Sequence, residues 1–205
     1  MEIKSKVLVF GGELIRFTHQ SSETKTPMTC AVFLPNPTAT AIPFILYLSG
    51  LTCTDENVCQ KSGVFKKLAE KQIAFVAPDT SPRGAGIDGE DESWDFGTGA
   101  GFYLDATASK WSNNYRMYSY INKELPSVLR QYFPQLDHSR YIVVYCRSIV
   151  LKTRETMPRR GIVIKIKRTM PCRSIITLYY STALSSSLSL YLNIALSPSS
   201  ATLCL

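Results

Sequence analysis

The chain of 205 residues is long enough for one domain with a substantial core, and its 23 Lys and Arg against 16 Asp and Glu give a formal net charge of +7. This charge is uneven, because residues 146–205 carry 9 basic residues and one acid (net +8), whereas residues 1–145 carry 14 and 15 (net −1). The basic balance therefore excludes no function for the larger segment and indicates no nucleic-acid partner for it.

Cysteine usage is uninformative about a disulfide framework, and the cysteines and histidines do not match the common zinc sites. The 6 cysteines form no CxxC pair, and no two histidines stand at zinc-ligand spacing. We therefore expect reduced thiols and no zinc site of the common kinds. The N-terminus, Met1-Glu-Ile-Lys-Ser-Lys, lacks the apolar core of a secretory leader, so we expect a cytoplasmic protein.

The first third of the chain is predicted to form antiparallel strands. The segments Lys6–Phe10 and Glu13–His19 flank a Gly11-Gly12 pair, which would supply the positive φ of a tight hairpin turn. A third strand, Met28–Leu34, ends at two prolines, which cannot extend the ladder.

Apolar runs then alternate with segments of helical period. Pro43–Leu48 is apolar throughout, as in a strand buried on both faces, and Asp55–Lys71 has helical spacing. Ile73–Ala77 predicts the next strand. The segment Asn113–Phe133 is helical in period, and its Pro126 predicts a kink or a new helix start.

Tyr141–Tyr145 is the last predicted strand, with His138 in the loop before it. The alternation predicts an α/β fold with a mostly parallel sheet and antiparallel strands at its N-terminal edge. With nothing strand-like placed after it by this pattern, Tyr141–Tyr145 is expected to remain an unpaired edge.

Two loops follow the first two parallel strands and are expected to meet at one end of the sheet. The first, Ser49–Thr54, could offer backbone N–H groups to an oxyanion, and Leu51 is the preferred donor. A plain strand-to-helix turn, with Gly50 as its flexible residue, is the alternative.

Cys53 directly precedes a predicted helix, whose N-terminus could lower the pKa of its thiol. A cysteine nucleophile would need a base, and the chain offers only His19 and His138. A structural or merely reactive thiol is the favoured interpretation.

The second loop is rich in glycine, aromatic and acidic residues. Trp94, Asp95 and Phe96 could line an apolar pocket or pack within a compact loop. The spacing of Gly97, Gly99 and Gly101 is no dinucleotide fingerprint, because no helix opens there. A solvated rim is expected from a set of carboxylates that lacks calcium-loop spacing: Asp88, Glu90, Asp91 and Glu92.

Five motifs between about residues 8 and 145 resemble the S-formylglutathione hydrolase (esterase D) family. They are Ser49–Thr54, Ala77–Gly84, Gly89–Tyr103, Tyr115–Tyr120 and Glu124–Pro126. The resemblance implies the N-terminal half of an α/β-hydrolase and a cofactor-independent serine thioesterase. In its expected reaction, S-formylglutathione and water give glutathione and formate through an acyl-serine intermediate, a step of formaldehyde detoxification. A small ester is the other expected substrate. A homodimer is left open.

The same resemblance assigns the site residues. Leu51 becomes the oxyanion-hole donor, and Cys53 the thiol beside the site that makes such enzymes sensitive to thiol reagents. After Tyr145 the family has Gly-His-Ser-Met-Gly-Gly, the nucleophile elbow. This chain has Cys146-Arg-Ser-Ile-Val-Leu151, in which Ser148 is in register with the nucleophile.

This departure predicts a catalytically incompetent chain. Cys146 and Val150 replace both elbow glycines, and side chains at those positions should clash in so tight a turn. The fold orders its triad as Ser, Asp, His, yet no acid follows Glu155 and no histidine follows His138. Without a base, Ser148 is a poor nucleophile.

We therefore divide the chain into a partial α/β-hydrolase domain (1–145) and a non-homologous, poorly ordered tail (146–205). A shifted reading frame, a retained intron or a wrong gene model would explain the tail. A membrane anchor over Ile175–Leu196 is not favoured, because 8 of its 22 residues are Ser, Thr or Asn. A basic patch for nucleic acid or anionic lipid lacks interleaved aromatics. The alternative function is a non-enzymatic, truncated paralogue that is tail-anchored or binds an intact subunit.

Overall fold

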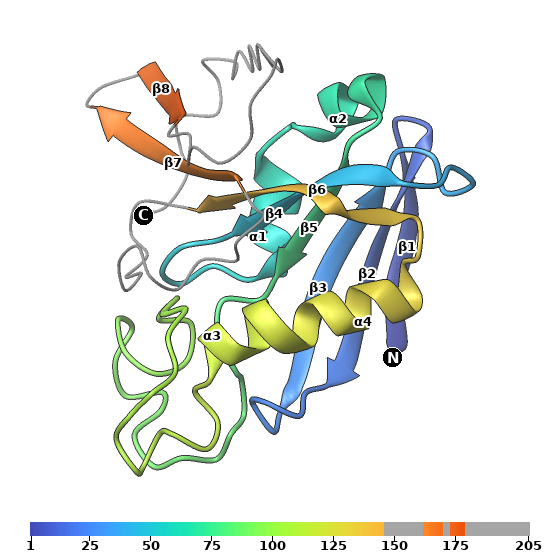
Figure 1. Ribbon diagram of the computed structural model, residues 1–205. Coiled ribbons are helices and arrows are strands. Elements are labelled where there is room, and N and C mark those ends of the chain that lie inside the picture. The colour runs from blue at the N-terminus through green and yellow to red at the C-terminus, as the bar shows by residue number, and fades with distance from the viewer. Residues whose placement is uncertain (146–161, 170–172, 179–205) are drawn as a thin grey trace.

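The computed structural model describes residues 1–145, 162–169 and 173–178, and builds them around one eight-stranded sheet (Figure 1). The strands are β1 (Glu2–Val9), β2 (Gly12–Gln20), β3 (Pro27–Leu34), β4 (Ile42–Leu48), β5 (Ala74–Pro78), β6 (Leu136–Tyr145), β7 (Ile162–Thr169) and β8 (Arg173–Leu178). Their order is β1-β2-β3-β5-β4-β6-β7-β8. β5, β4, β6 and β7 run parallel, and β1, β2 and β3 add antiparallel strands at one side, which confirms the α/β fold.

Helices cover both faces of the sheet (Figure 1). Helices α1 (Asp55–Lys61) and α2 (Phe65–Lys71) bury Val58, Phe65 and Leu68 against one face. On the other face lie α3 (Met117–Ser119), the π-helical turn η1 (Tyr120–Glu124) and α4 (Leu125–Tyr132). Both faces of the central strands are thus apolar and buried, which explains the continuous apolar run of β4.

The hairpin between β1 and β2 forms as predicted, but its turn lies one residue earlier. The positive φ values belong to Phe10 (49°) and Gly11 (81°), not to Gly12. Gly12 is required for a different reason. A Cβ there would lie 2.4 Å from the carbonyl oxygen of Leu34 on β3.

The single helix predicted over residues 55–71 is wrong, because the structure breaks it into α1 and α2. Gly63 adopts φ +61° between them and turns the chain. A capping box begins α1, with Thr54 and Asn57 satisfying each other's backbone N–H groups. Apolar spacing alone did not reveal the break, because Val58 and Phe65 pack on the same face.

Pro126 marks a helix start, one of the two outcomes predicted for it. It lies in the first turn of α4, and the preceding turn η1 is π-helical, with the Leu125 N–H bonded to the Tyr120 carbonyl. Proline has no N–H to donate to the carbonyl four residues back, so the backbone shifts register there. The predicted helix also begins at Met117 rather than Asn113.

Two predictions around β6 are wrong. The strand begins at Leu136, so His138 lies within it rather than in a loop. The strand is also no edge, because β7 pairs with it in parallel from Ile142 to Tyr145.

The basic segment thus contributes β7 and β8 to the sheet, and β8 covers the first residues of the apolar stretch proposed as a membrane anchor. The rest of that stretch, like Ser148 and its neighbours, lies outside the described residues. Over the described ranges, no helix is both long and apolar enough to cross a bilayer.

Candidate functional site

The loop after β4, residues 49–54, lies at the carboxyl ends of the parallel strands and is fixed by contacts from two other loops. From the glycine-rich loop, Tyr103 donates its hydroxyl to the Ser49 carbonyl at 3.0 Å. The Thr52 N–H donates to the Gly99 carbonyl at 2.8 Å. The two stretches singled out by the sequence are therefore in direct contact.

Thr52 has φ +63°, a conformation that is costly for a β-branched residue. Such strain persists only where surrounding contacts hold it, and it gathers at functional sites. Here the bond from Thr52 to Gly99 and the Cys53 N–H bond to the Gly50 carbonyl at 3.2 Å hold the turn on both sides of Leu51.

Two glycines of the second loop are needed for close backbone approach. Gly101 has φ +70°, and a Cβ on it would lie 3.2 Å from both Gly50 C and Leu51 N. Gly97 has φ +76°, and its Cβ would come within 2.2 Å of the Glu90 carbonyl oxygen. The glycine series thus serves packing of one loop on another, in agreement with the rejection of a nucleotide fingerprint.

The loop after β5 also holds the backbone of the β4 loop in place. Asp79 pairs with Arg83 through two hydrogen bonds, Nε to Oδ2 at 2.8 Å and Nη2 to Oδ1 at 2.9 Å. This bond raises the pKa of Arg83, so the guanidinium stays charged. The same Nη2 also donates to the Cys53 carbonyl at 3.3 Å, as does the buried Thr80 hydroxyl at 2.5 Å.

Ser81 links the supports, because its Oγ accepts the Gly99 N–H at 2.7 Å. The roles of these residues of the β5 loop, and of Tyr103, were not predicted, although the motifs containing them were. The one usable signal was an acid and an arginine four residues apart directly after a buried strand.

Leu51, the preferred oxyanion donor, is half-buried at the centre of this arrangement. Within residues 1–145, no oxygen accepts a hydrogen bond from its N–H. A backbone N–H held by neighbours on both sides, at the carboxyl edge of a parallel sheet, can stabilise a negative oxygen without reorganising. The prediction that Leu51 is this donor remains a prediction.

Cys53 is buried, and its carbonyl accepts hydrogen bonds from Thr80 and Arg83 of the β5 loop. The thiols of Cys30 and Cys59 stay protonated at pH 7. Burial raises the pKa of Cys59 to about 12 and that of Cys30 well above its ordinary value. The start of α1, just after Cys53, is anchored to β2. The fully buried Asp55 carboxylate accepts two hydrogen bonds there from Arg16.

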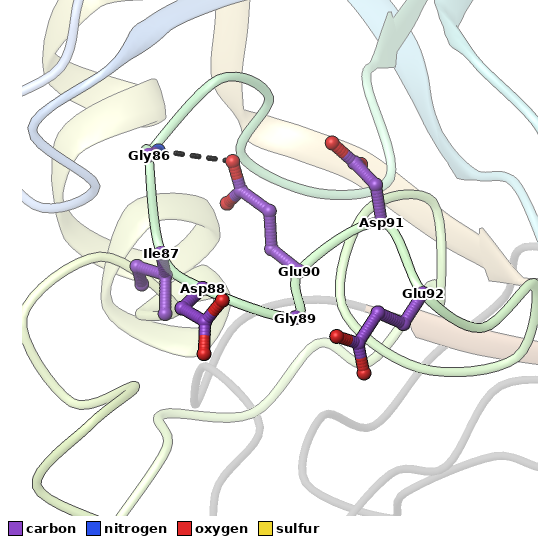
Figure 2. Close-up of a pocket in the computed structure, with 7 residues that line it drawn as sticks. All are labelled: Gly86, Ile87, Asp88, Gly89, Glu90, Asp91 and Glu92. Carbon is purple, nitrogen blue, oxygen red and sulfur yellow. Dashed lines mark hydrogen bonds between the residues drawn. The ribbon is translucent and has the colours of Figure 1, made fainter.

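The three pocket candidates lie on the surface. Trp94 is 70% exposed, Phe96 is 47% exposed and packs edge-to-face on Trp111, and Asp95 bonds the Ser93 hydroxyl. The hollow in this region is instead lined by the preceding residues, Gly86–Glu92 (Figure 2).

Glu90 corrects the expectation of a purely solvated acidic rim. It is buried, and its carboxylate accepts from the Gly86 N–H at 2.9 Å (Figure 2). The carboxylate also accepts from the Tyr115 hydroxyl at 3.3 Å. Asp88 and Asp91 are exposed, as expected of a rim. Glu90 therefore shapes the loop that carries the pocket candidates.

Neither histidine is placed as a base for this loop. His19 is buried on β2, two strands from β5, where its ring stacks on Tyr120 and its Nε2 lies 3.1 Å from that hydroxyl. His138 lies near the amino end of β4, since Leu136 pairs with Ile42. Burial lowers the pKa of both imidazoles, so both are neutral at pH 7.

Comparison with known proteins agrees with this architecture. The Esterase family model matches residues 21–146, more than half of the chain. S-formylglutathione hydrolase of Bos taurus is 52% identical over 126 residues, 61% of this chain and 45% of the relative. That of Arabidopsis thaliana is 48% identical over 135 residues, 64% of this chain and 47% of the relative.

A solved structure gives the same result. S-formylglutathione hydrolase from Agrobacterium tumefaciens superposes with a TM-score of 0.68 at 44% identity, over 71% of this chain and 52% of that one. The chain spans about half the length of the curated relatives it matches. From its motifs, its α/β sheet and these matches, the chain belongs to the Esterase family and resembles S-formylglutathione hydrolases over about 60–70% of its length.

Proposed function

We propose that residues 1–145 form the oxyanion-binding half of a serine thioesterase of the S-formylglutathione hydrolase type. One observation carries the proposal: Leu51 N–H lies at the crossing of the β4 loop and the Gly97–Gly101 stretch, between the strained Thr52 and the close contact of Gly101. About 50% identity to S-formylglutathione hydrolases over this same segment supports it.

In such a reaction a serine hydroxyl attacks the thioester carbonyl carbon, and the carbonyl oxygen becomes an oxyanion. The Leu51 N–H would stabilise that charge, and the supports at Thr80, Ser81 and Arg83 would keep the N–H in place. Trp94, Asp95 and Phe96 remain proposed pocket residues, whose exposed side chains could cover a bound substrate. Cys53 remains the proposed thiol beside the site.

We further propose that a polypeptide of these 205 residues does not catalyse the reaction. Ser148 is in register with the nucleophile, but Cys146 and Val150 would put Cβ atoms where a tight strand-to-helix turn needs glycine. No histidine follows Ser148 in this sequence, and His19 and His138 are engaged elsewhere. The domain boundary at residue 145, a small thioester substrate and a cytoplasmic location belong to the same proposal.

The test is the rate of formate release from S-formylglutathione by the purified 205-residue chain. The expected rate equals that of the Ser148→Ala variant and of buffer alone. Turnover that is abolished by Ser148→Ala would overturn the proposed incompetence. Turnover that survives Ser148→Ala would point to a different nucleophile, and so would also overturn the assigned role of Ser148.

A further inference from the structure

One nitrogen of the Arg83 guanidinium makes no hydrogen bond within residues 1–145. Nε and Nη2 bond to the Asp79 carboxylate, and Nη2 also bonds to the Cys53 carbonyl, whereas Nη1 has no bond of this kind. The buried side-chain atoms that lack a partner in the same part of the chain belong to other residues, so solvent reaches Nη1. The Arg83 side chain is accordingly 38% exposed.

Arg16 shows how the same group is used elsewhere in this chain. Its Nε and Nη2 bond to Asp55 at 2.5 and 3.1 Å, as those of Arg83 bond to Asp79. Its Nη1 lies 3.3 Å from a second carboxylate, that of Glu56. A guanidinium can hold a carboxylate on each of two edges, because its five N–H donors form a planar fork. Arg83 holds one carboxylate and presents its other edge to solvent.

The solvent-facing edge of Arg83 lies beside the candidate site. Nη2 is 3.3 Å from the carbonyl oxygen of Cys53, two residues after Leu51. Because a chain extends by at most about 3.6 Å per residue, the Leu51 nitrogen lies within about 15 Å of the guanidinium. A Cβ on Gly99 would lie 3.9 Å from Nη1. The lack of a side chain on Gly99 therefore keeps this nitrogen accessible.

The chemistry of this edge suits a single carboxylate. The hydrogen bond to Asp79 raises the pKa of Arg83, so the guanidinium stays protonated near neutral pH. Charge-assisted N–H bonds to a carboxylate are short and strong. A more highly charged anion is disfavoured, because Asp79 already compensates the positive charge and the nearby loop exposes Asp88, Asp91 and Glu92.

On the basis of the function proposed above, we propose that Arg83 Nη1 binds a carboxylate on the thiol part of the substrate. The thiol part of S-formylglutathione is a tripeptide with two carboxylates, and a tripeptide reaches about 10 Å. This reach is of the same order as the separation between Leu51 and Arg83. Arg83 is therefore a specificity-determining residue that favours thioesters of anionic thiols over neutral esters.

Calorimetric titration of the full 205-residue chain with two ligands tests this assignment. The ligands are S-methylglutathione and its dimethyl ester, in which both carboxylates are neutralised. The dissociation constant of the dimethyl ester is expected to be at least about 10-fold larger, because a charge-assisted hydrogen bond is lost. Equal dissociation constants, or no binding of S-methylglutathione up to about 10 mM, would overturn the proposal.

Two conservative variants test which residue causes the preference. Arg83→Lys keeps the positive charge but lacks the second edge of the fork, so it should lose the preference for S-methylglutathione. Arg140→Lys changes an exposed arginine that is also paired with an aspartate, and it should keep the preference. Circular dichroism checks the fold of both variants. A preference that survives in Arg83→Lys would overturn the proposal, and the ligand pair decides on the unmodified chain if this variant does not fold.

The role of Arg83 and the proposed function can fail separately. Neither ligand has a thioester carbonyl, so the ratio of their affinities does not depend on the Leu51 N–H. Thioester turnover by residues 1–145 joined to the carboxyl-terminal half of a relative tests Leu51. Equal affinities beside such turnover would remove only the role of Arg83, and a clear preference without turnover would remove only that of Leu51.

Discussion

Gly101 lies against the β4 loop with φ +70°, and the space for its absent side chain is taken by the backbone of Gly50 and Leu51. Two costs would follow from a methyl group at this position: the strained backbone and the contact at 3.2 Å. Gly84, in the preceding loop, has a similar φ of +68° but no atom within 4 Å of an added Cβ. Substitutions at the two glycines therefore distinguish the cost of backbone strain from the cost of losing close packing.

Gly101→Ala is expected to lower the free energy of unfolding by more than Gly84→Ala. Both variants bear about 1–3 kcal/mol for the left-handed backbone, and only the first also pushes the two loops apart. Urea unfolding of both variants measures the difference. Equal losses would show that the loops do not depend on this close approach.

His138 couples the free energy of folding to pH. Its Nε2 is buried without a hydrogen-bond partner in the described part of the chain, and its ring packs edge-on against Phe44. Burial, with a contribution from the positive charge of Arg130, lowers its pKa from the ordinary 6.5. Protonation is therefore disfavoured in the folded state.

Because the unfolded chain binds this proton more readily, stability should fall as the pH is lowered from 7.5 through 6.5 towards the folded-state pKa. His138→Gln should flatten this dependence. Part of the pH dependence should remain in this variant, because the pKa of His19 is also lowered. Urea unfolding at pH 7.5 and 5.5 tests this, since the carboxylates with lowered pKa act only below their ordinary value of about 4.5. An unchanged slope in His138→Gln would contradict the account.

At the scale of elements, sequence patterns predicted strands better than turns. Each predicted strand from Lys6 to Tyr145 exists, because apolar runs of this length must be buried and the sheet offers them two covered faces. The ends of helices and the positions of turns depend on the backbone angles of single residues. Gly63 ended α1, and Phe10 rather than Gly12 took the positive φ, for reasons of local geometry that apolar spacing does not contain.

The same limit applies to the site. Its place at the carboxyl ends of β4 and β5 was predictable, because parallel strands bring their ends together. The contacts to the Cys53 carbonyl from Thr80 and Arg83 were not, because a carbonyl carries no sequence signal. Glu90 was misjudged because acidic neighbours suggested solvent, whereas its partners come from Gly86 and the distant Tyr115.

The β1–β2 hairpin yields a prediction of its own. Phe10→Asn should stabilise the fold by about 0.5–1 kcal/mol, because asparagine accepts a left-handed turn position at lower cost than phenylalanine. Thermal or urea unfolding measures the gain. Phe102→Asn, at a 37% exposed phenylalanine without positive φ, is the matched control and should give no gain. A destabilised Phe10→Asn would mean that the ring contributes to the monomer.

At the scale of the whole molecule, the described residues form one sheet, and contacts between loops hold the backbone at the carboxyl ends of β4 and β5. Identity near 50% spans 126–137 residues and about half of each relative. The β4 and β5 loops and the glycine-rich loop all lie within residues 21–146, which the Esterase family model matches. We therefore expect residues 1–145 to retain a working half-site.

A chimera with a relative tests this expectation. Residues 1–145 of this chain would be joined to the remaining carboxyl-terminal part of the Bos taurus S-formylglutathione hydrolase, and formate release from S-formylglutathione would be measured. We expect activity within about 10-fold of the bovine enzyme, and a further loss of at least about 100-fold on Leu51→Pro, which removes the proposed oxyanion donor. A chimera that folds, by circular dichroism and sedimentation, yet shows no turnover would contradict this expectation.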